Sequence, residues 1–434
     1  ISKFSKIAIK NKIKASIKFQ LRDYATFIHS DAVKSDDKYV RRFLDTKLSI
    51  KEFKELFNYV KKNKLMTSCT PFDENSVKII EKFKFDYLKI ASASAQEWPL
   101  LERVSHNKIP KIISTGGLNF EQIDKIVSFF MHKNQKFCLM HCIAVYPSED
   151  YGLNLSIISE LKKRYPNIEI GWSTHENPHN FDPVKIAYSL GARVFEKHIG
   201  IKSKVYKLNN YSLTPKLFEN WFSELIKTKN IIGGKKYLNH RKKEIVTLNK
   251  LQRGVYLKRN VSKNTNIKFK DVYFAFPKLN GQLSSSDFTN NSLSKLGIKK
   301  NQPLLERYVT KAKKSDEVYL KHHLHKVRAI LNYSQINLGN NLDLEISHHY
   351  GLNKLSIFGC VLINCINREY CKKIIVLTEN QRHPLHFHKK KEETFHILYG
   401  KLYSKLNGKL NILSPGDKIL VKPKVKHEFW TNKN

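Results

Sequence analysis

The sequence predicts an α/β fold for about the first 240 of its 434 residues and β-rich structure for the rest. Two observations predict this fold. Short β-rich runs alternate with segments of helical periodicity over residues 1–235, and polar side chains gather where each run ends. Because each connecting helix returns the chain to the same edge of the sheet, the alternation predicts parallel strands.

Seven strands are expected, preceded by a helix. The predicted strands span residues 15–20, 66–70, 87–92, 110–115, 136–142, 168–174 and 193–200. The clearest helix begins after Asn119, a suitable N-cap, and carries Ile123, Ile126, Val127 and Phe130 at helical spacing. Seven strands suit an open sheet, whereas a closed barrel requires eight, so a barrel here would lack its first strand. We expect residue 1 to be a truncation point, because no initiator Met is present.

Polar side chains end every predicted strand. They are Lys18 and Gln20, Thr70, Lys89 and Ser92, Ser114 and Thr115, His141, Ser173 and His175, and Glu196 and His198. In a barrel, the carboxyl ends of the strands converge on one face and form the active site. The lysines and hydroxyls suit a phosphate and a carboxylate, and two histidines on adjacent strands suit a divalent metal. The backbone amides of residues 114–117 could form an anion nest. Alternatively, these polar residues simply begin loops.

Composition narrows the class of protein. Lys and Arg number 78 against 38 Asp and Glu, a net charge of +40, but the lysines are spread over many helices. This indicates a solvated basic surface rather than a nucleic-acid interface. No apolar run reaches the ~18–20 residues of a membrane helix. The six cysteines form no CxxC pair, so we expect buried, reduced thiols and a cytoplasmic protein.

Six short motifs together resemble those of sialic acid synthases, the N-acetylneuraminate synthase-like enzymes that condense phosphoenolpyruvate with an N-acetylated amino sugar. The motifs are Thr70-Pro71-Phe72-Asp73, Lys89-Ile90-Ala91-Ser92, Ser114-Thr115-Gly116, His141-Cys142 with Tyr146-Pro147, Ser173-Thr174-His175 and Glu196-Lys197-His198. The resemblance covers about residues 10–310. It implies a (β/α)8 TIM barrel over residues 1–240, with its first strand missing.

The resemblance also implies a role for individual residues. The positions that hold the phosphate and carboxylate of phosphoenolpyruvate are Lys18, Thr70, Lys89, Ser92, Ser114 and Ser173. His175 and His198 match the two metal ligands, usually for Mn²⁺, while Gln20 and Tyr146 match positions that face the sugar. Lys18, Lys89, His175 and His198 are therefore the expected catalytic residues.

Three departures from the family's pattern concern the sugar side. Ser94 replaces an acidic residue, Ala144 replaces an Asn, and residues 207–212 replace a Gly-Pro-Asp-His segment. Most of the phosphoenolpyruvate and metal set is kept. We therefore expect the same reaction with a different acceptor sugar, giving a nonulosonate-type 2-keto acid.

Residues 246–312 resemble the antifreeze-like (SAF) domain that follows the barrel in these synthases. The matching positions include Arg253-Gly254-Val255-Tyr256, Asp271-Val272, Gly297 and Gln302-Pro303-Leu304. The resemblance implies a domain-swapped homodimer. The Arg that this domain supplies to the sugar is not evident, because the matching segment is Phe274-Ala275-Phe276-Pro277. The alternative is a small β domain that only dimerises.

After a Lys-rich linker at residues 311–314, residues 320–434 resemble a cupin. His386-Phe387-His388, Glu393 and Gly400 match the first cupin motif, and Gly416-Asp417 and His427 match the second. Histidines at i and i+2 of a strand share a face. Together His386, His388, Glu393 and His427 suggest a second divalent metal site, for Mn, Fe, Zn or Ni. We expect His383, His396 and the pair His348-His349 to be surface or core residues, and the cupin to be incomplete after His427.

Two other functions stay open. The cupin could carry the main activity as a metal-dependent sugar isomerase or epimerase. Alternatively, the chain could be a non-catalytic sugar- or nucleic-acid-binding protein with a decayed barrel.

Overall fold

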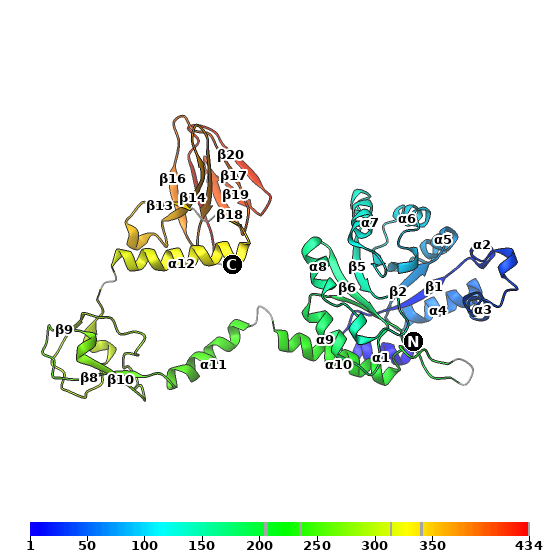
Figure 1. The fold of residues 1–434 in the computed structure, drawn as a ribbon, viewed down its shortest axis with the longest axis horizontal. Helices are drawn as coiled ribbons and strands as arrows, with labels where there is room; N and C mark the ends of the chain where they lie inside the picture. Colours follow the sequence, from blue (N-terminus) through cyan, green and yellow to red (C-terminus); the bar gives the residue numbers. More distant parts are fainter. Residues whose placement is uncertain (204–206, 234–236, 313–314, 339–341, 433–434) are drawn as a thin grey trace. The chain divides into compact units, whose positions relative to one another are not determined.

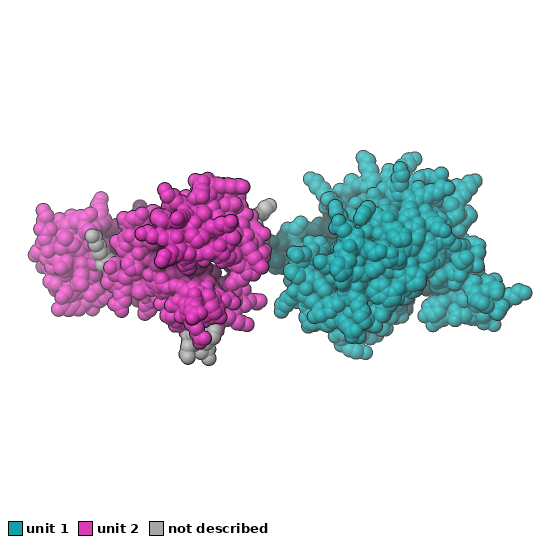
Figure 2. Space-filling view, turned by 90° about the horizontal axis from the view of Figure 1, so that it is seen from above, with its two compact units in different colours: residues 1–240 teal, residues 241–434 magenta. Residues whose placement is uncertain are grey.

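The computed structural model describes residues 1–434 except 204–206, 234–236, 313–314, 339–341 and 433–434. The chain divides into two compact units, residues 1–240 and 241–434, which carry different colours in Figure 2. Residues 246–312 and 320–434, which were expected to form the second and third domains, both fall within the second unit. Lys313 and Lys314 of the expected linker lie outside the described residues.

The first unit is built on a parallel sheet of seven strands in sequential order (Figure 1). The strands are β1 (Ser16–Leu21), β2 (Met66–Pro71), β3 (Tyr87–Ile90), β4 (Lys111–Ser114), β5 (Phe137–Cys142), β6 (Glu169–Thr174) and β7 (Val194–Lys197). Each corresponds to one predicted strand. The seven-strand prediction is therefore confirmed, with ends that differ from the predicted ones by at most three residues.

Helices precede, connect and follow these strands. They are α1 (Ser2–Lys10), α2 (Tyr24–Phe27), α3 (Lys38–Asp45), α4 (Ile50–Lys62), α5 (Glu74–Phe83), α6 (Trp98–Ser105), α7 (Phe120–His132), α8 (Ile157–Arg164), α9 (Asp182–Ser189) and α10 (Pro215–Ile232). In α7, the Asn119 side chain accepts from the Gln122 amide while Gln122 bonds back to the Asn119 amide, so both free amide donors are satisfied. The four apolar residues predicted for its inner face are all buried. The predicted amphipathic helix is confirmed.

The sheet curls back on itself. β1 and β7 are its two outermost strands, yet Lys18 Nζ on β1 lies 3.1 Å from Glu196 Oε1 on β7. Among the described residues, β1 and β7 share no backbone ladder. The architecture is a (β/α)8-type barrel whose gap falls where the missing first strand was expected.

The strand register aligns the carboxyl ends of the barrel strands. Gln20 pairs with Thr70 across β1 and β2. Ser173 pairs with Cys142 on one side and with Glu196 on the other. Because the carboxyl ends of neighbouring parallel strands lie level with one another, the predicted site residues come to one face of the barrel.

The second unit begins with the end of α11 (Tyr237–Lys250), which continues from the first, and contains two β-rich parts separated by α12 (Asp316–Ser334). The first part holds β8 (Gly254–Leu257), β9 (Asn266–Ile267), β10 (Val272–Ala275), β11 (Ser292–Ser294) and β12 (Val309–Thr310). Its core includes Val255, Leu257, Ile267, Leu283 and Leu304, all fully buried.

Among the described residues, the strands of the second β-rich part pair in antiparallel fashion, and one isolated parallel bridge joins Phe358 to Arg382. Its strands are β13 (Asp343–His348), β14 (Gly359–Asn367), β15 (Cys371–Val376), β16 (Arg382–His386), β17 (Glu393–His396), β18 (Leu402–Leu406), β19 (Lys409–Leu413), β20 (Lys418–Val421) and β21 (His427–Trp430). β13–β14–β15 and β16–β21–β18–β19 form two sheets, and β17 pairs with β20. The expected all-β C-terminal region is confirmed.

Two further expectations can be compared with the structure. All six cysteines are free, but Cys365 and Cys371 are exposed, so the prediction of general burial was wrong for these two. A register shift between Asn364 and Ile366 interrupts the alternation of β14, and Cys371 begins an edge strand. No helix in the described ranges has the length and hydropathy needed to cross a bilayer.

Candidate active site and metal centre

The carboxyl ends of the barrel strands surround a cavity of about 370 Å³. Its lining includes all ten residues predicted for the barrel site: Lys18, Gln20, Thr70, Lys89, Ser92, Ser114, Tyr146, Ser173, His175 and His198. Six of them lie on five strands, β1, β2, β3, β4 and β6, and the other four lie in the segments that follow β3, β5, β6 and β7. The expectation that strand-end polar residues meet at one mouth is met for these ten and for Glu196. It was wrong for Thr115 and His141, which are buried away from the cavity lining and bind the carbonyl oxygens of Met140 and Leu153.

Two lysines and a glutamate form the charged floor of this cavity. Glu196 Oε1 lies 3.1 Å from Lys18 Nζ and 3.8 Å from Lys89 Nζ, and it accepts a 3.0 Å hydrogen bond from Ser173 Oγ. Burial alone would raise the pKa of the Glu196 carboxyl, but the two ammonium groups bring it down to about 2. Lys89 is 2% exposed, and burial lowers its pKa. The floor thus carries two cationic side chains for one carboxylate, a balance that favours an anionic ligand.

Hydroxyl groups lie around this charged floor. Lys89 Nζ donates to Ser114 Oγ, and Ser92 Oγ accepts a 3.1 Å hydrogen bond from the amide of Gly116. A Cβ at Gly116 would lie 2.7 Å from Ser92 Oγ, so only glycine permits this approach. The Thr115 amide donates to Met140 O at 3.0 Å. The predicted anion nest is wrong for Thr115 and Gly116, because both amides already bind protein atoms.

The two histidines predicted to bind metal face each other across β6 and β7. Their ring centroids are 5.3 Å apart, and His175 Nδ1 lies 3.2 Å from the carbonyl oxygen of Ile143, which leaves Nε2 free. Burial lowers the pKa of both imidazoles to about 4, with Lys18 adding to the effect at His198. Neutral imidazoles with a free nitrogen are suited to holding a divalent metal.

A buried ion pair joins the segments that carry these histidines. Lys197, which precedes His198, places its Nζ 2.9 Å from Oε1 of Glu176, which follows His175. The same Nζ donates to the Glu176 carbonyl oxygen at 3.2 Å. Because the pair is almost wholly buried, it holds the ends of β6 and β7 in a fixed relation.

Aromatic rings cover the outer side of the histidine pair. Tyr146 lies 4.2 Å from His175 between ring centroids, and Tyr211 lies 5.0 Å from His198 and 5.7 Å from Tyr146. Tyr211 belongs to the segment that departs from the family's pattern. Of the other departures, Ala144 lines the cavity, whereas the buried Ser94 is not part of its lining.

The sequence interpretation assigned no role to two residues that are central in the structure. Glu196 was recognised only as a strand-end polar residue and part of a motif, although it contacts both lysines. Its alternation with Lys197 on β7 already indicated that its side chain faces the barrel interior. Tyr211 could not be found this way, because its contacts depend on the path of a loop.

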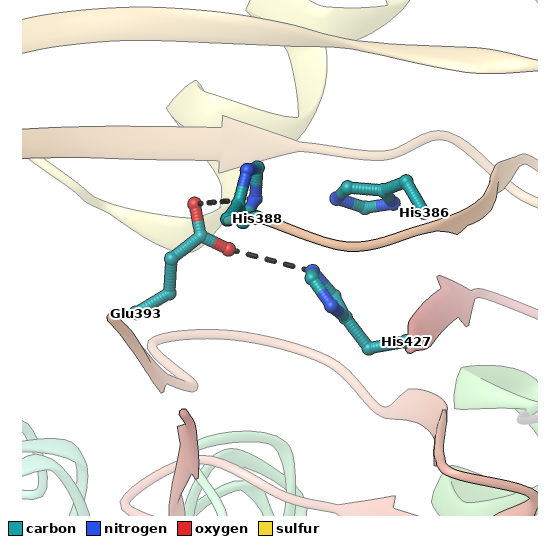
Figure 3. Close-up of side chains that lie close together, drawn as sticks. All are labelled: His386, His388, Glu393 and His427. Atoms are coloured by element: carbon teal, nitrogen blue, oxygen red, sulfur yellow. Dashed lines mark ion pairs between the residues drawn. The ribbon is translucent and has the colours of Figure 1, made fainter. Parts of the chain in front are cut away.

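The cupin residues form a second cluster, drawn in Figure 3. The ligand atoms of His386, His388, Glu393 and His427 all lie within 4.8 Å of one another. Glu393 bridges two of the histidines: its Oε1 is 3.3 Å from His388 Nε2, and its Oε2 is 3.5 Å from His427 Nε2 (Figure 3). All four predicted cupin ligands are therefore brought together.

Hydrogen bonds fix the tautomers of two of these histidines. His386 Nδ1 lies 2.8 Å from Pro384 O, and His427 Nδ1 lies 3.0 Å from Val425 O. Both Nε2 atoms are thus available, as in a metal site with backbone partners in its outer shell. In the described chain, the buried Nε2 atoms of His388 and His427 have no hydrogen bond beyond their contacts with Glu393. Three histidines and one carboxylate therefore fit a divalent metal.

The pKa shifts of Glu393 and His386 agree with that role, whereas that of His427 does not: burial would lower its pKa, but its hydrogen bond to Glu393 raises it. Burial would raise the pKa of the Glu393 carboxyl, but His427 and Lys391 lower it to about 2. Burial lowers the pKa of His386. The carboxylate is ionised at neutral pH, as metal binding requires.

Comparisons with known proteins agree with the two folds. The NeuB family matches residues 6–237, more than half of the chain, and the cupin domain matches residues 373–434. A solved structure from Chromobacterium violaceum, assigned as spore coat polysaccharide biosynthesis protein E, is 35% identical with a TM-score of 0.69. The alignment covers 71% of this chain and 93% of that one.

Characterised relatives match over shorter stretches. Mouse N-acetylneuraminate-9-phosphate synthase is 27% identical over 181 residues, 42% of this chain and 49% of its own. Campylobacter jejuni N,N'-diacetyllegionaminic acid synthase is 28% identical over 202 residues, 45% of this chain and 57% of its own. The chain thus spans about half the length of these relatives. By its barrel, its strand-end cavity and a match over more than half its length, the protein belongs to the NeuB family, and it carries a C-terminal cupin domain.

Proposed function

We propose that the barrel condenses phosphoenolpyruvate with the aldehyde of an N-acetylated amino sugar, releasing phosphate and forming a nonulosonate-type 2-keto acid. The observation that carries the proposal is the single cavity in which two lysines, four hydroxyl residues and a neutral histidine pair meet. The relatives named as sialic acid-type synthases support it. The activity is that of a transferase that forms a carbon–carbon bond.

In this proposal, the phosphate and carboxylate of phosphoenolpyruvate lie against Lys18 and Lys89. Thr70, Ser92, Ser114 and Ser173 complete their hydrogen bonds. The ammonium groups stabilise the negative charge of the substrate in a site that is already ordered before binding. Glu196 lies 3.1 Å from Lys18 Nζ and 3.8 Å from Lys89 Nζ, which orients both lysines into the cavity.

The reaction follows from the electron-rich enol of the substrate. Its methylene carbon attacks the sugar aldehyde and forms the new carbon–carbon bond, while a proton is delivered to the aldehyde oxygen. Water then adds to C2 of the phosphoenolpyruvate portion, and the resulting tetrahedral intermediate expels phosphate as its C–O bond breaks. A divalent metal such as Mn²⁺, held by His175 and His198, would supply Lewis acidity at the aldehyde.

The acceptor sugar would lie on the outer side of the cavity. Gln20 and Tyr146 line this region, and Tyr211 extends its aromatic wall. Because Ala144 and the segment containing Tyr211 replace polar groups of the family's pattern, the proposed acceptor differs from N-acetylmannosamine.

The test is phosphate release from phosphoenolpyruvate by the full chain with Mn²⁺ and a panel of N-acetylated amino sugars, with and without a phosphate group. Release that depends on one acceptor supports the proposal. No release with any acceptor, together with salt-sensitive DNA binding, would favour a basic binding protein instead.

The cupin cluster supports a second candidate function, because its four ligands leave open positions for a substrate. In this view the cupin is a metal-dependent sugar isomerase or epimerase. Loss of condensation in His175→Ala and its retention in His386→Ala would separate the two activities.

We also propose that residues 246–312 form a SAF-type domain and that the protein is a homodimer. A solution mass twice the 50.8 kDa of one chain would support this, and a monomer would exclude it.

A further inference from the structure

Three polar side chains outside the four-residue cupin set meet at one point. His349 Nε2 and His383 Nε2 are 3.2 Å apart, and Ser347 Oγ lies 3.3 Å from the first and 3.4 Å from the second. The three separations differ by only 0.2 Å. No part of the proposed function uses these residues.

The local fold explains how they come together. Ser347 lies in β13 and His349 follows two residues later, so both side chains emerge on the same side of the chain. His383 lies in β16, where its ring stacks on Phe429 at 4.7 Å between centroids. This stacking restricts the imidazole of His383, while His349 remains exposed to solvent.

A hydrogen bond accounts for only part of this geometry. Two neutral imidazole nitrogens can share one N–H···N bond, and the Ser347 hydroxyl can donate one more, so ordinary hydrogen bonds explain at most two of the three distances. A tetrahedral metal with bonds of about 2.0–2.1 Å separates its ligand atoms by about 3.3 Å. All three distances match this value.

We infer that Ser347, His349 and His383 hold a divalent cation at a second site of the cupin domain. Two imidazoles favour a borderline metal of the Zn²⁺ type over Ca²⁺ or Mg²⁺. The exposure of His349 leaves the remaining coordination position to water or a small ligand.

The site neighbours the predicted cupin metal site but does not share its ligands. The rings of His383 and His386 are 4.5 Å apart between centroids. Among the described residues, His349 contacts none of the four cupin ligands. A substitution at His349 can therefore test the new site without removing a ligand of the other.

The experiment measures Zn²⁺ retained by the metal-depleted full chain after equilibrium dialysis. We expect His349→Ala to bind one zinc fewer than wild type, or to bind that zinc at least tenfold more weakly. His349→Cys should retain it, because a thiolate is a zinc ligand. His348→Ala is the matched control. His348 is also exposed and precedes His349, but among the described residues it has no hydrogen bond to this cluster, so the variant should behave as wild type.

A His427→Ala variant distinguishes the two cupin sites. This variant should lose the zinc of the four-ligand cupin site. The double variant His349→Ala/His427→Ala should therefore lose both zinc ions. Equal zinc content in wild type and His349→Ala would overturn the inference. Equal losses in His348→Ala and His349→Ala would overturn it as well, because they would indicate adventitious surface binding.

Discussion

Glu196 determines the charge state of the barrel site. It is the carboxylate that both lysines contact, and it remains ionised because their attraction outweighs the cost of its burial. Lys89, buried at the bottom of the cavity, has no comparable anionic partner among the residues described. Without Glu196, the charged form of Lys89 would be much less favourable.

Replacing Glu196 with Gln preserves the shape of the side chain and removes its charge. We expect kcat/KM for phosphoenolpyruvate to fall about a hundredfold, which corresponds to ~2.7 kcal/mol, because Lys18 and Lys89 lose the partner that orients them. Phosphate release measures the effect. Glu160→Gln, on the exposed side of α8, is the control, and a Glu196→Gln variant within threefold of wild type would contradict this role.

Tyr211 offers a test of the sugar side. Its ring covers His198 and Tyr146, so Tyr211→Ala should raise KM for the acceptor about tenfold and leave KM for phosphoenolpyruvate nearly unchanged. Tyr211→Phe keeps the ring and should retain more affinity than Tyr211→Ala. Steady-state kinetics with each substrate varied in turn makes the measurement, and a change confined to phosphoenolpyruvate would refute the assignment.

At the scale of single residues, the strand-end positions could be predicted because a polar residue that ends a parallel strand points to the shared mouth. Lys18 and His198 are examples. The pairing of His349 with His383 could not be predicted in this way. It depends on how β13 and β16 approach each other, which no local pattern in the sequence encodes.

At the scale of elements, the buried pair of Glu176 and Lys197 links the ends of the two strands that precede His175 and His198, the histidines proposed to bind metal. Lys197→Met would leave the Glu176 carboxylate buried without its counter-charge, at a cost of about 3–5 kcal/mol in unfolding free energy. We also expect weaker Mn²⁺ binding. The double variant Glu176→Gln/Lys197→Met should recover most of the stability in urea titrations, and no recovery would argue against the pair as the cause.

A second ion pair, between Glu81 and Arg103, joins α5 to α6. Arg103 donates two hydrogen bonds to Glu81, at 2.9 and 2.7 Å, and these hold the pKa of the carboxyl below its ordinary value of 4.5. A lowered carboxyl pKa stabilises the fold above pH 4.5, and this stabilisation disappears as the pH falls through the folded-state pKa. Glu81→Gln should therefore cost about 1 kcal/mol at pH 7.

The difference between Glu81→Gln and wild type should shrink steadily below pH 4.5 in chemical unfolding measured across pH. Glu121→Gln, whose carboxylate forms an exposed pair with Lys125 within α7, should show a smaller effect at pH 7. A difference for Glu81→Gln that is constant from pH 7 to pH 3 would show that the ion pair is not its source.

Elements were predictable where hydrophobic periodicity was strong. The seven barrel strands and α7 were located because their buried faces repeat with regular spacing. Strand ends were less certain, since hydrogen bonding rather than hydrophobicity decides where a strand stops. The exposure of Cys365 was missed because a register shift in β14 reverses the expected alternation.

At the scale of the whole molecule, two groups of side chains suited to a metal occur in one chain on unrelated folds. The barrel offers two neutral histidines beside an anion-binding floor, whereas the cupin offers three histidines and a carboxylate. The curl of the sheet, which brings Lys18 and Glu196 together, followed from the resemblance to a barrel family. The strand count alone was also compatible with an open sheet.

The central claim is that the barrel cavity joins the methylene carbon of phosphoenolpyruvate to a sugar aldehyde. The most direct test is carbon NMR of the full chain turning over phosphoenolpyruvate labelled at that methylene, with Mn²⁺ and an acceptor identified from the sugar panel. The label should move to a product methylene in step with phosphate release, in wild type and His386→Ala but not in His175→Ala. Phosphate release without a new labelled methylene, or labelled product formed undiminished by His175→Ala, would contradict the account.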